Sequence, residues 1–422
     1  MNYILGVLFI LILIFLINNY LKKNALKKLK KQLTENWGLK TKKEHFNFFV
    51  ISKYFNNNSH KEKAYHILSE KNNIDFDIDA VFKFIDRTSS KIGQQYLYFK
   101  LRTIGSKKDL LKFDELTSVF EKDKELSISC QLELTKLNNN NSYYLEELVN
   151  DTQLEKPKHL WIVKALTITA ISSIILLFFY PICSLLLVPV FSANLFFHYK
   201  NKHTVAYYLN GVNQLSKALK VSQQLAKSKK IAPHFKDLSF IDSMKSIKLK
   251  TEFIAFEKNV SDEFLFFFWF AAEMVKILFN VEYLVFYSFL ESITKERQNI
   301  ENLFLFIGEI DAAISTASLK SGNLKICTPT FNDQNELNVE GIYHPLIDNC
   351  IKNNLHLLDK SMLLTGSNMS GKTTFIRTVA VNSILAQTLH ICFADAYSAP
   401  YYKVYSSIRI TDDLLDNTSY YL

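Results

Sequence analysis

The sequence of 422 residues predicts a mixed fold class, in which transmembrane helices accompany an all-α region and an incomplete α/β domain of the phosphate-loop (ABC) type. Two long apolar runs are flanked by lysines, which is typical of membrane spans. The stretches between them have helical periodicity, and a glycine-rich motif lies near the C-terminal end. With 48% hydrophobic and 22% charged residues, the chain is too apolar to be a disordered tail.

The N-terminal apolar run predicts a transmembrane anchor at residues 1–20. Residues 3–17 are uninterrupted by charge, and lysines follow between Lys22 and Lys31, whereas a signal peptide carries its positive charge before the run. The positive-inside rule places the N-terminus outside and the lysines in the cytoplasm. The alternative is a buried helix.

The next segment, residues 21–75, is expected to be a basic cytoplasmic linker. The leucines between Leu21 and Leu33 share one helical stripe with lysines between them, which suits an anionic membrane surface. The same face could instead contact DNA phosphates.

A second apolar block, residues 160–198, predicts a transmembrane hairpin of two helices, at about 161–180 and 182–197, that turns at Pro181. Lysines lie before and after the block and none lies near the turn, so both ends are expected in the cytoplasm. The protein is therefore expected to be a multi-pass protein of the cell (inner, cytoplasmic) membrane. The lipid bilayer is its first expected partner.

A third apolar stretch, residues 264–290, contains Glu273, Lys276 and Glu282, and charges at mid-bilayer are costly. Glu273 and Lys276 are three residues apart on one helix face, where they can pair. We expect one long buried or interfacial helix here, and the alternative is a fourth span.

Cysteine and arginine usage excludes several classes of protein. Five scattered cysteines without metal-ligand spacing argue against a disulfide scaffold or a structural metal site. They indicate a reducing compartment for the soluble part. The net charge is +9, yet only five of the 50 basic residues are arginine, which disfavours sequence-specific reading of DNA bases.

The motif with the clearest chemistry is a complete GxxxxGK[ST] phosphate-binding loop. Its residues are Gly366, Ser367, Asn368, Met369, Ser370, Gly371, Lys372 and Thr373. An apolar run at 361–365 predicts a strand entering the loop, and residues 374–388 predict a helix leaving it, so that backbone N–H groups point at phosphates. Lys372 is expected to reach the outer phosphates, and the Thr373 hydroxyl to bind Mg²⁺. The alternative is a glycine loop without a ligand.

Hydrolysis would also need a metal-holding Asp on a neighbouring strand, usually followed by a catalytic Glu. Asp395 is the one candidate after the loop, but Ala396 follows it. The chain stops at Leu422, so we expect a sequence cut short before a nucleotide-binding sheet is complete, and the catalytic residues remain unknown.

These residues resemble the MutS family of DNA-binding ATPases. The family loop has the form TGxNMxGK[ST][ST], which residues 365–374 match up to Thr374, with Arg377 following as in the family. His344-Pro345-Leu346 is similar to the HP[LV] element that opens the family's ATPase domain. Asn353 resembles the asparagine of its VxN segment, and Ile351 or Cys350 stands where the family places an apolar or aromatic contact to adenine.

The resemblance continues on both sides of the loop. Asp412, Asp413 and Leu414, with Ser419 after them, are similar to the family's DDL and STFM elements, which meet nucleotide across a dimer interface. Residues 86–93 resemble the DxTxTxxG element that opens the family's helical lever, and residues 299–318 its helical return. An alternative for Asp86 and Thr88 is simple capping of a helix from Ser90 to Leu101. His344 is expected to shape a turn instead of serving as a base.

The resemblance implies a domain order and a function. The helical core would occupy 76–158 and 205–325, on either side of the hairpin, and the truncated ATPase domain 326–422. It implies ATP and Mg²⁺ as cofactors, no other small-molecule substrate, a homodimer formed through the ATPase domains, and double-stranded DNA bound without sequence specificity. About 60 residues between the first span and Asp86 are too few for the family's mismatch-reading domain. The alternatives are a membrane scaffold or switch that binds nucleotide without DNA, or an inactive truncated fragment.

Overall fold

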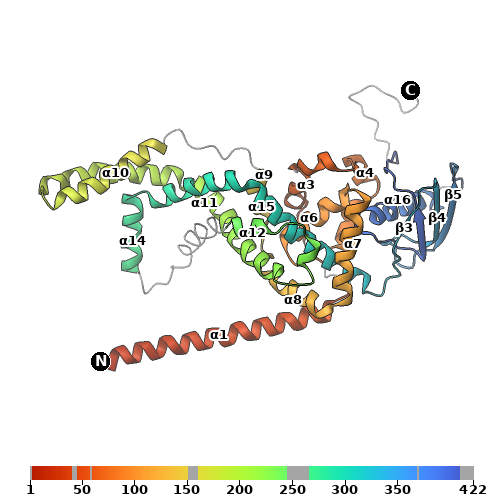
Figure 1. Cartoon of the computed structure of the whole chain (residues 1–422), viewed down its shortest axis with the longest axis horizontal. Coiled ribbons are helices and arrows are strands. Elements are labelled where there is room, and N and C mark those ends of the chain that lie inside the picture. Colours follow the sequence, from red (N-terminus) through yellow and green to blue (C-terminus); the bar gives the residue numbers. More distant parts are fainter. Residues whose placement is uncertain are drawn as a thin grey trace, which may run out of the picture. The chain divides into compact units, whose positions relative to one another are not determined.

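The computed structural model describes residues 2–39, 45–57, 59–150, 160–244, 266–367 and 370–408. The chain is mostly helical and carries two small sheets (Figure 1). It divides into two compact units, one built from residues 1–135 and 308–422 and the other from residues 136–307.

The first unit begins with a series of helices. They are α1 (Asn2–Asn36), α2 (Phe48–Ile51), α3 (Lys53–Asn57), α4 (Glu70–Asp75), α5 (Ile78–Ile85), α6 (Lys91–Arg102), α7 (Lys107–Lys122) and α8 (Lys124–Leu134), with 3-10 turns η1 (Ser59–Lys63) and η2 (Thr135–Leu137). Strands β1 (His66–Ile67) and β2 (Thr103–Ile104) pair antiparallel.

Helix α1 runs through the boundary that the sequence suggested at residue 20. Residues 7–37 contain no glycine or proline, and leucine and lysine are good helix formers, so nothing stops the helix before Gly38, whose φ is +80°. The leucine stripe between residues 21 and 33 is thus helical, as expected.

The expected linker also contains packed structure. Ile51 and Tyr54 are fully buried, and Tyr54 meets the Phe99 ring edge-on with the centroids 5.2 Å apart. Ile51, Tyr54 and Phe55 therefore belong to the helical core, although Phe49 in the same stretch is 77% exposed.

The turn between α5 and α6 is organised by one buried carboxylate. Asp311 accepts hydrogen bonds from the backbone N–H of Ser89 and of Ser90, both at 2.8 Å, and from the Ser90 hydroxyl at 2.6 Å. Burial raises the pKa of Asp311 to about 7, although these hydrogen bonds lower it. The negative charge of nearby Asp86 also raises the pKa. Asp311 thus fixes the start of α6 from a helix more than 200 residues further along the chain.

The predicted helix from Ser90 to Leu101 is confirmed as α6. Ser90 is its N-cap and accepts from the Gly93 N–H at 2.9 Å. Asp86 accepts from the backbone N–H and the hydroxyl of Thr88, at 2.9 and 2.6 Å. Asp86 and Thr88 thus punctuate the turn, as the alternative interpretation expected, but the capping that it assigned to them is made by Ser90.

The C-terminal part of the first unit is a small sheet with one helix beside it. Strands β3 (Thr330–Phe331), β4 (Glu336–Ile342), β5 (Asn353–Leu358) and β6 (Ala396–Ala399) lie in the order β3-β6-β4-β5, and α16 (Lys372–Leu389) precedes β6 in the chain. Strand β4 pairs antiparallel with both β5 and β6, and β3 pairs parallel with β6. Val339, Ile342, Ala386 and Tyr397 are among the residues of the core between this sheet and α16.

The second unit is entirely helical in its described residues. Its elements are η3 (Asn140–Tyr144), α9 (Leu145–Asn150), α10 (Leu160–Leu177), η4 (Pro181–Cys183), α11 (Ser184–Ala226), η5 (Ala232–His234), α12 (Ser239–Ser243), α14 (Phe266–Leu278) and the first part of α15 (Val281–Lys320). Among the residues that the structure describes, three stretches are long and apolar enough to cross a membrane: Leu160–Leu177, Pro181–Lys200 and Tyr283–Lys320.

Two of these three stretches expose their apolar side chains. They form the hairpin of α10 and α11, where Phe178 at the turn is 87% exposed and Ile182 is 73% exposed. In contrast, 83% of the most apolar part of Tyr283–Lys320 is buried inside the protein. Its apolar side chains therefore pack against other parts of the chain. Helix α11 extends to Ala226, well past the predicted end at residue 197, because no proline lies between Pro189 and Pro233 and the single Gly211 weakens a helix without ending it.

The prediction of one long helix over residues 264–290 is wrong. Helix α14 ends at Leu278 and α15 begins at Val281, because Asn280 adopts a left-handed φ of 51°. Asn194 of α11 holds this break: its Nδ2 donates to the Leu278 carbonyl at 2.6 Å, and its Oδ1 accepts from Asn280 Nδ2 at 2.6 Å. The expected pair of Glu273 and Lys276 is present, at 3.2 Å.

Candidate phosphate-binding site

The glycine loop leads directly into α16. Gly371 is the N-cap of this helix with φ +88°, a conformation that favours glycine, and Lys372 is the first helical residue. The predicted helix from Thr374 to Thr388 is therefore confirmed. Its first N–H groups and the positive end of its dipole face the loop, an arrangement that attracts anions.

Lys372 folds back over the loop. Its Nζ donates to the carbonyls of Gly366 at 2.7 Å and Ser367 at 2.5 Å. The ammonium group is thus held by two neutral acceptors at the mouth of the loop. An anion placed there offers charged oxygens that can replace those carbonyls.

A cavity of about 670 Å³ adjoins the loop, a size within the usual range for small-molecule sites. Its lining includes loop and helix residues, namely Thr365, Ser370, Gly371, Lys372 and Thr374, and residues of the segment before β5, namely Ile347, Asn349, Cys350 and Ile351. Ile351 is 81% exposed, although it is a large aliphatic residue. An apolar side chain left open beside polar loop residues suits a ligand with a flat apolar part and an anionic part.

The structure brings together most of the residues that the motif singled out and that it describes. Ser370, Gly371, Lys372, Thr374 and Ile351 line one cavity, and Gly366 and Ser367 contact Lys372. Thr373 is exposed in the first turn of α16. Asn368, Met369, Asp412, Asp413 and Ser419 lie outside the described residues.

The strand predicted over residues 361–365 is not formed. The chain leaves β5 at Leu358 and reaches the loop without strand structure, with Leu363 89% exposed and Met362 40% exposed. A strand exists only where a neighbour pairs with its backbone, and no strand among the described residues runs beside this segment. The apolar pattern that predicted the strand is real, but its pairing partner is absent from the described part.

Asp395, the weak candidate for a metal-holding residue, is ion-paired. Its Oδ1 lies 2.7 Å from Lys325 Nζ and 2.8 Å from Lys352 Nζ. The hydrogen bonds from these two lysines lower the pKa of Asp395. Within the described ranges, no group of three or more His, Cys, Asp or Glu side chains could hold a metal ion.

Helix α16 is fixed at several points along its length. Arg377 pairs with Asp77, the residue before α5, at 3.0 Å. Asn382 donates to the Tyr343 carbonyl at 3.1 Å and accepts from the Phe393 N–H at 2.7 Å. A displacement of the helix at its loop end would therefore change its contacts with both α5 and the sheet.

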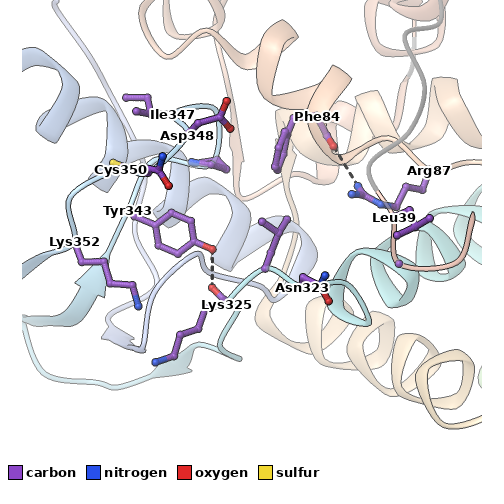
Figure 2. A pocket seen from close by; sticks show the side chains of 14 residues that line it. Leu39, Phe84, Arg87, Asn323, Lys325, Tyr343, Ile347, Asp348, Cys350 and Lys352 are labelled. Atoms are coloured by element: carbon purple, nitrogen blue, oxygen red, sulfur yellow. Dashed lines mark hydrogen bonds between the residues drawn. The ribbon is translucent and has the colours of Figure 1, made fainter.

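A second cavity, of about 440 Å³, shares a wall with the first (Figure 2). Ile347, Asn349 and Cys350 line both cavities. Figure 2 shows Arg87 bonded to the Phe84 carbonyl, at 3.1 Å, and the Tyr343 hydroxyl bonded to the Lys325 carbonyl, at 3.0 Å. The segment 347–350 thus separates the two cavities and contributes residues to both.

His344 shapes the turn that starts this wall, as expected. Its Nδ1 accepts from the Leu346 N–H at 3.3 Å, and burial lowers its pKa, which favours the neutral ring that such an acceptor requires. Asn353, singled out from the sequence, begins β5 and donates to the Ile351 carbonyl at 3.0 Å, so it positions the residue that lines the cavity.

Sequence reasoning missed the part played by Asn349 and Asp311. Asn349 has a left-handed φ of 55°, which places it in the cavity wall, and no local pattern distinguishes it from other asparagines. Asp311 lies within a long helix, only two residues after Glu309, so the sequence around it does not single out a buried carboxylate.

The chain was also compared with known proteins. No family model matches the chain. Over about a third of its length, however, the chain is related to the MutS family.

The individual relatives are DNA mismatch repair proteins named MutS. That of Staphylococcus epidermidis is 30% identical over 152 residues, covering 34% of this chain and 17% of the relative. Those of Oceanobacillus iheyensis and Streptococcus mutans are 32% identical over 154 residues and 28% identical over 152 residues, covering 17% and 18% of those proteins. The chain thus matches less than a fifth of the length of these relatives.

Proposed function

We propose that the chain is a membrane-anchored, MutS-like ATP-binding protein, related in function to the DNA mismatch repair proteins. The observation that carries the proposal is the position of Lys372, held over the glycine loop at the N-terminus of α16 and beside a cavity of about 670 Å³.

Different residues in and beside this cavity contact different parts of the nucleotide. Lys372 exchanges its two carbonyl acceptors for the outer phosphate oxygens, and the backbone N–H groups at the start of α16 hold the inner phosphates. Ile351 offers an apolar surface to the base, and the hydroxyl of Thr373, next to the cavity residues Lys372 and Thr374, would hold Mg²⁺. Magnesium, when bound, neutralises phosphate charge. Asp412, Asp413 and Ser419 would then meet nucleotide bound to the second subunit of a homodimer.

An ion pair connects the nucleotide loop to the helical region, so that a movement of α16 can reach α5. Arg377 follows Lys372 by little more than one helical turn and is paired with Asp77 at the start of α5. We propose that nucleotide binding shifts α16 and that this pair transmits the shift to α5 and the helices packed with it.

The exposed hairpin supports location in the inner membrane. An uncovered apolar surface as large as that of α10 and α11 would aggregate in water, and a bilayer removes it from water. With both ends of the hairpin in the cytoplasm, the nucleotide site faces the cytoplasm too.

The direct test is Lys372→Ala in the full chain, purified in detergent, with ATP affinity measured by titration of a fluorescent ATP analogue. Loss of the charge-assisted contacts should weaken binding about 100-fold. Lys360→Ala is the matched control, because Lys360 is exposed on the same segment but does not line the cavity. Equal affinity of both variants and the unmodified chain would contradict the proposal.

A second candidate is a membrane scaffold or switch that binds nucleotide without DNA. The burial and pairing of the arginines favour it. Arg87 and Arg102 are 8% and 2% exposed, and Arg377 is paired with Asp77, so these three of the five arginines are not available to DNA.

The two candidates differ in how they respond to salt. A DNA-binding chain should retard duplex DNA with an affinity that falls steeply as salt rises, because phosphate contacts release counterions. A scaffold should show no such binding at low salt.

A further inference from the structure

Two cysteines far apart in the sequence face each other beside α16. Cys327 precedes β3, and Cys392 lies between α16 and β6. They form an isolated antiparallel bridge, in which the Cys327 N–H donates to the Cys392 carbonyl at 2.9 Å and the Cys392 N–H donates to the Cys327 carbonyl at 3.0 Å. This mutual bonding marks a directly opposed pair.

The spacing of such a pair suits a disulfide. Opposed residues of this kind have Cα atoms about 5.5 Å apart, inside the range of about 4.4–6.8 Å that disulfides span. Their Cβ atoms are somewhat further apart than in the alternating non-hydrogen-bonded pairs, so closing the bond requires a small local twist. Such twist makes a disulfide easier to reduce again.

The two thiols differ in exposure and acidity. Cys327 is partly exposed, and a hydrogen bond from Cys392 lowers its pKa. Cys392 is fully buried, burial raises its pKa, and its Sγ lies 3.4 Å from Asn382 Oδ1 of α16. One accessible, more acidic thiol beside one shielded thiol is the arrangement of an attacking and a resolving cysteine.

We infer that Cys327 and Cys392 form a reversible thiol-disulfide site that reacts with small-molecule disulfides such as glutathione disulfide. The site does not depend on nucleotide binding.

The reaction balances in two exchanges. The Cys327 thiolate attacks one sulfur of glutathione disulfide, forms a mixed disulfide and releases one glutathione thiolate. Cys392 then loses its proton and attacks the Cys327 sulfur, which forms the protein disulfide and releases the second glutathione. Two protein thiols are oxidised, one glutathione disulfide is reduced to two glutathione molecules, and both thiol protons pass to the glutathione thiolates.

The product ties the segment before the sheet to the segment that leaves α16. It also removes the hydrogen of the Cys392 thiol, whose Sγ lies 3.4 Å from Oδ1 of Asn382, the residue that joins α16 to Tyr343 and Phe393. Oxidation therefore acts at the end of the helix whose other end carries Lys372.

The test incubates the full chain in detergent with glutathione buffers of rising oxidised-to-reduced ratio, followed by alkylation and mass spectrometry. Cys327 and Cys392 should lose their free thiols together, appear as one linked peptide pair and recover with dithiothreitol. Cys350 is the matched control: it is also partly exposed, but its Sγ faces the backbone carbonyl of Ile351.

Two variants separate the roles. Cys392→Ala, which avoids burying a hydroxyl, should leave Cys327 as a stable mixed disulfide with glutathione. Cys327→Ser should leave Cys392 unreacted. The inference is overturned if Cys350 pairs or is capped before Cys327, if Cys327 and Cys392 stay reduced when Cys350 is fully capped, or if Cys327 in the Cys392→Ala chain is not capped.

Discussion

The serine-rich turn at residues 86–93 and the glycine loop at residues 366–373 both lead into a helix, yet they are stabilised in opposite ways. In the turn, Asp311 accepts three hydrogen bonds from Ser89 and Ser90 and is completely buried. In the loop, the lysine is held by two of the loop's own carbonyls and the neighbouring Leu363 is 89% exposed.

The difference lies in where each element finds its partner. The turn is completed by a side chain of the same chain, so its backbone N–H groups are already satisfied and contribute to stability. The loop presents its lysine to a cavity, held only by two neutral carbonyls that an anionic ligand can replace. Stability should therefore depend on the turn, and binding on the loop.

The largest effect expected from this contrast is that of Asp311→Ala. Two buried N–H groups and one hydroxyl would lose their acceptor, which should lower the free energy of unfolding by about 3–5 kcal/mol. Urea unfolding of the full chain in detergent, followed by tryptophan fluorescence, measures this. Asp311→Asn keeps one acceptor oxygen and should lose less.

The binding variant Lys372→Ala provides the opposite case. It should leave the unfolding midpoint almost unchanged, since the lysine contacts only exposed loop carbonyls. Equal destabilisation by Asp311→Ala and Lys372→Ala would remove the distinction between the two elements.

A smaller contrast is expected between two glycines. In Gly93→Ala, the new methyl group would overlap the Asp311 carboxylate, so the turn must open at a cost of about 2–4 kcal/mol. In Gly371→Ala, no atom of the described residues lies within 4 Å of the new methyl, and the backbone strain at φ +88° costs about 1 kcal/mol. Thermal unfolding of both variants measures the difference, and a larger loss for Gly371→Ala would contradict it.

The sequence predicted the elements whose stability is local. The helices after Ser90 and after Gly371 begin where capping residues and glycine place them, and the apolar hairpin turns near Pro181. Local signals suffice there because a cap or a proline acts on its own neighbours.

The errors arose where a distant partner decides the outcome. Residues 361–365 have the pattern of a strand but no neighbouring strand among the described residues, and the helix expected over 264–290 breaks because Asn194 binds the backbone at Leu278. The sequence also could not predict the opposed pair of Cys327 and Cys392 or the hydrogen bonds of Asp311. Each of these contacts joins residues at least 65 positions apart. The candidate site was predicted in its phosphate loop and at Ile351, whereas the wall at Asn349 came only from the structure.

The smallest effect tests whether the segment before the loop contributes to the fold at all. Leu363→Gln should change the free energy of unfolding by no more than about 0.5 kcal/mol, because the side chain is 89% exposed and buries little apolar area. Leu355→Gln is the matched control on β5, where the side chain is 8% exposed and the loss should be about 2–3 kcal/mol. If the two variants are equally destabilised in the full chain, Leu363 is covered by apolar surface in the folded protein, and the segment before the loop contributes to the fold.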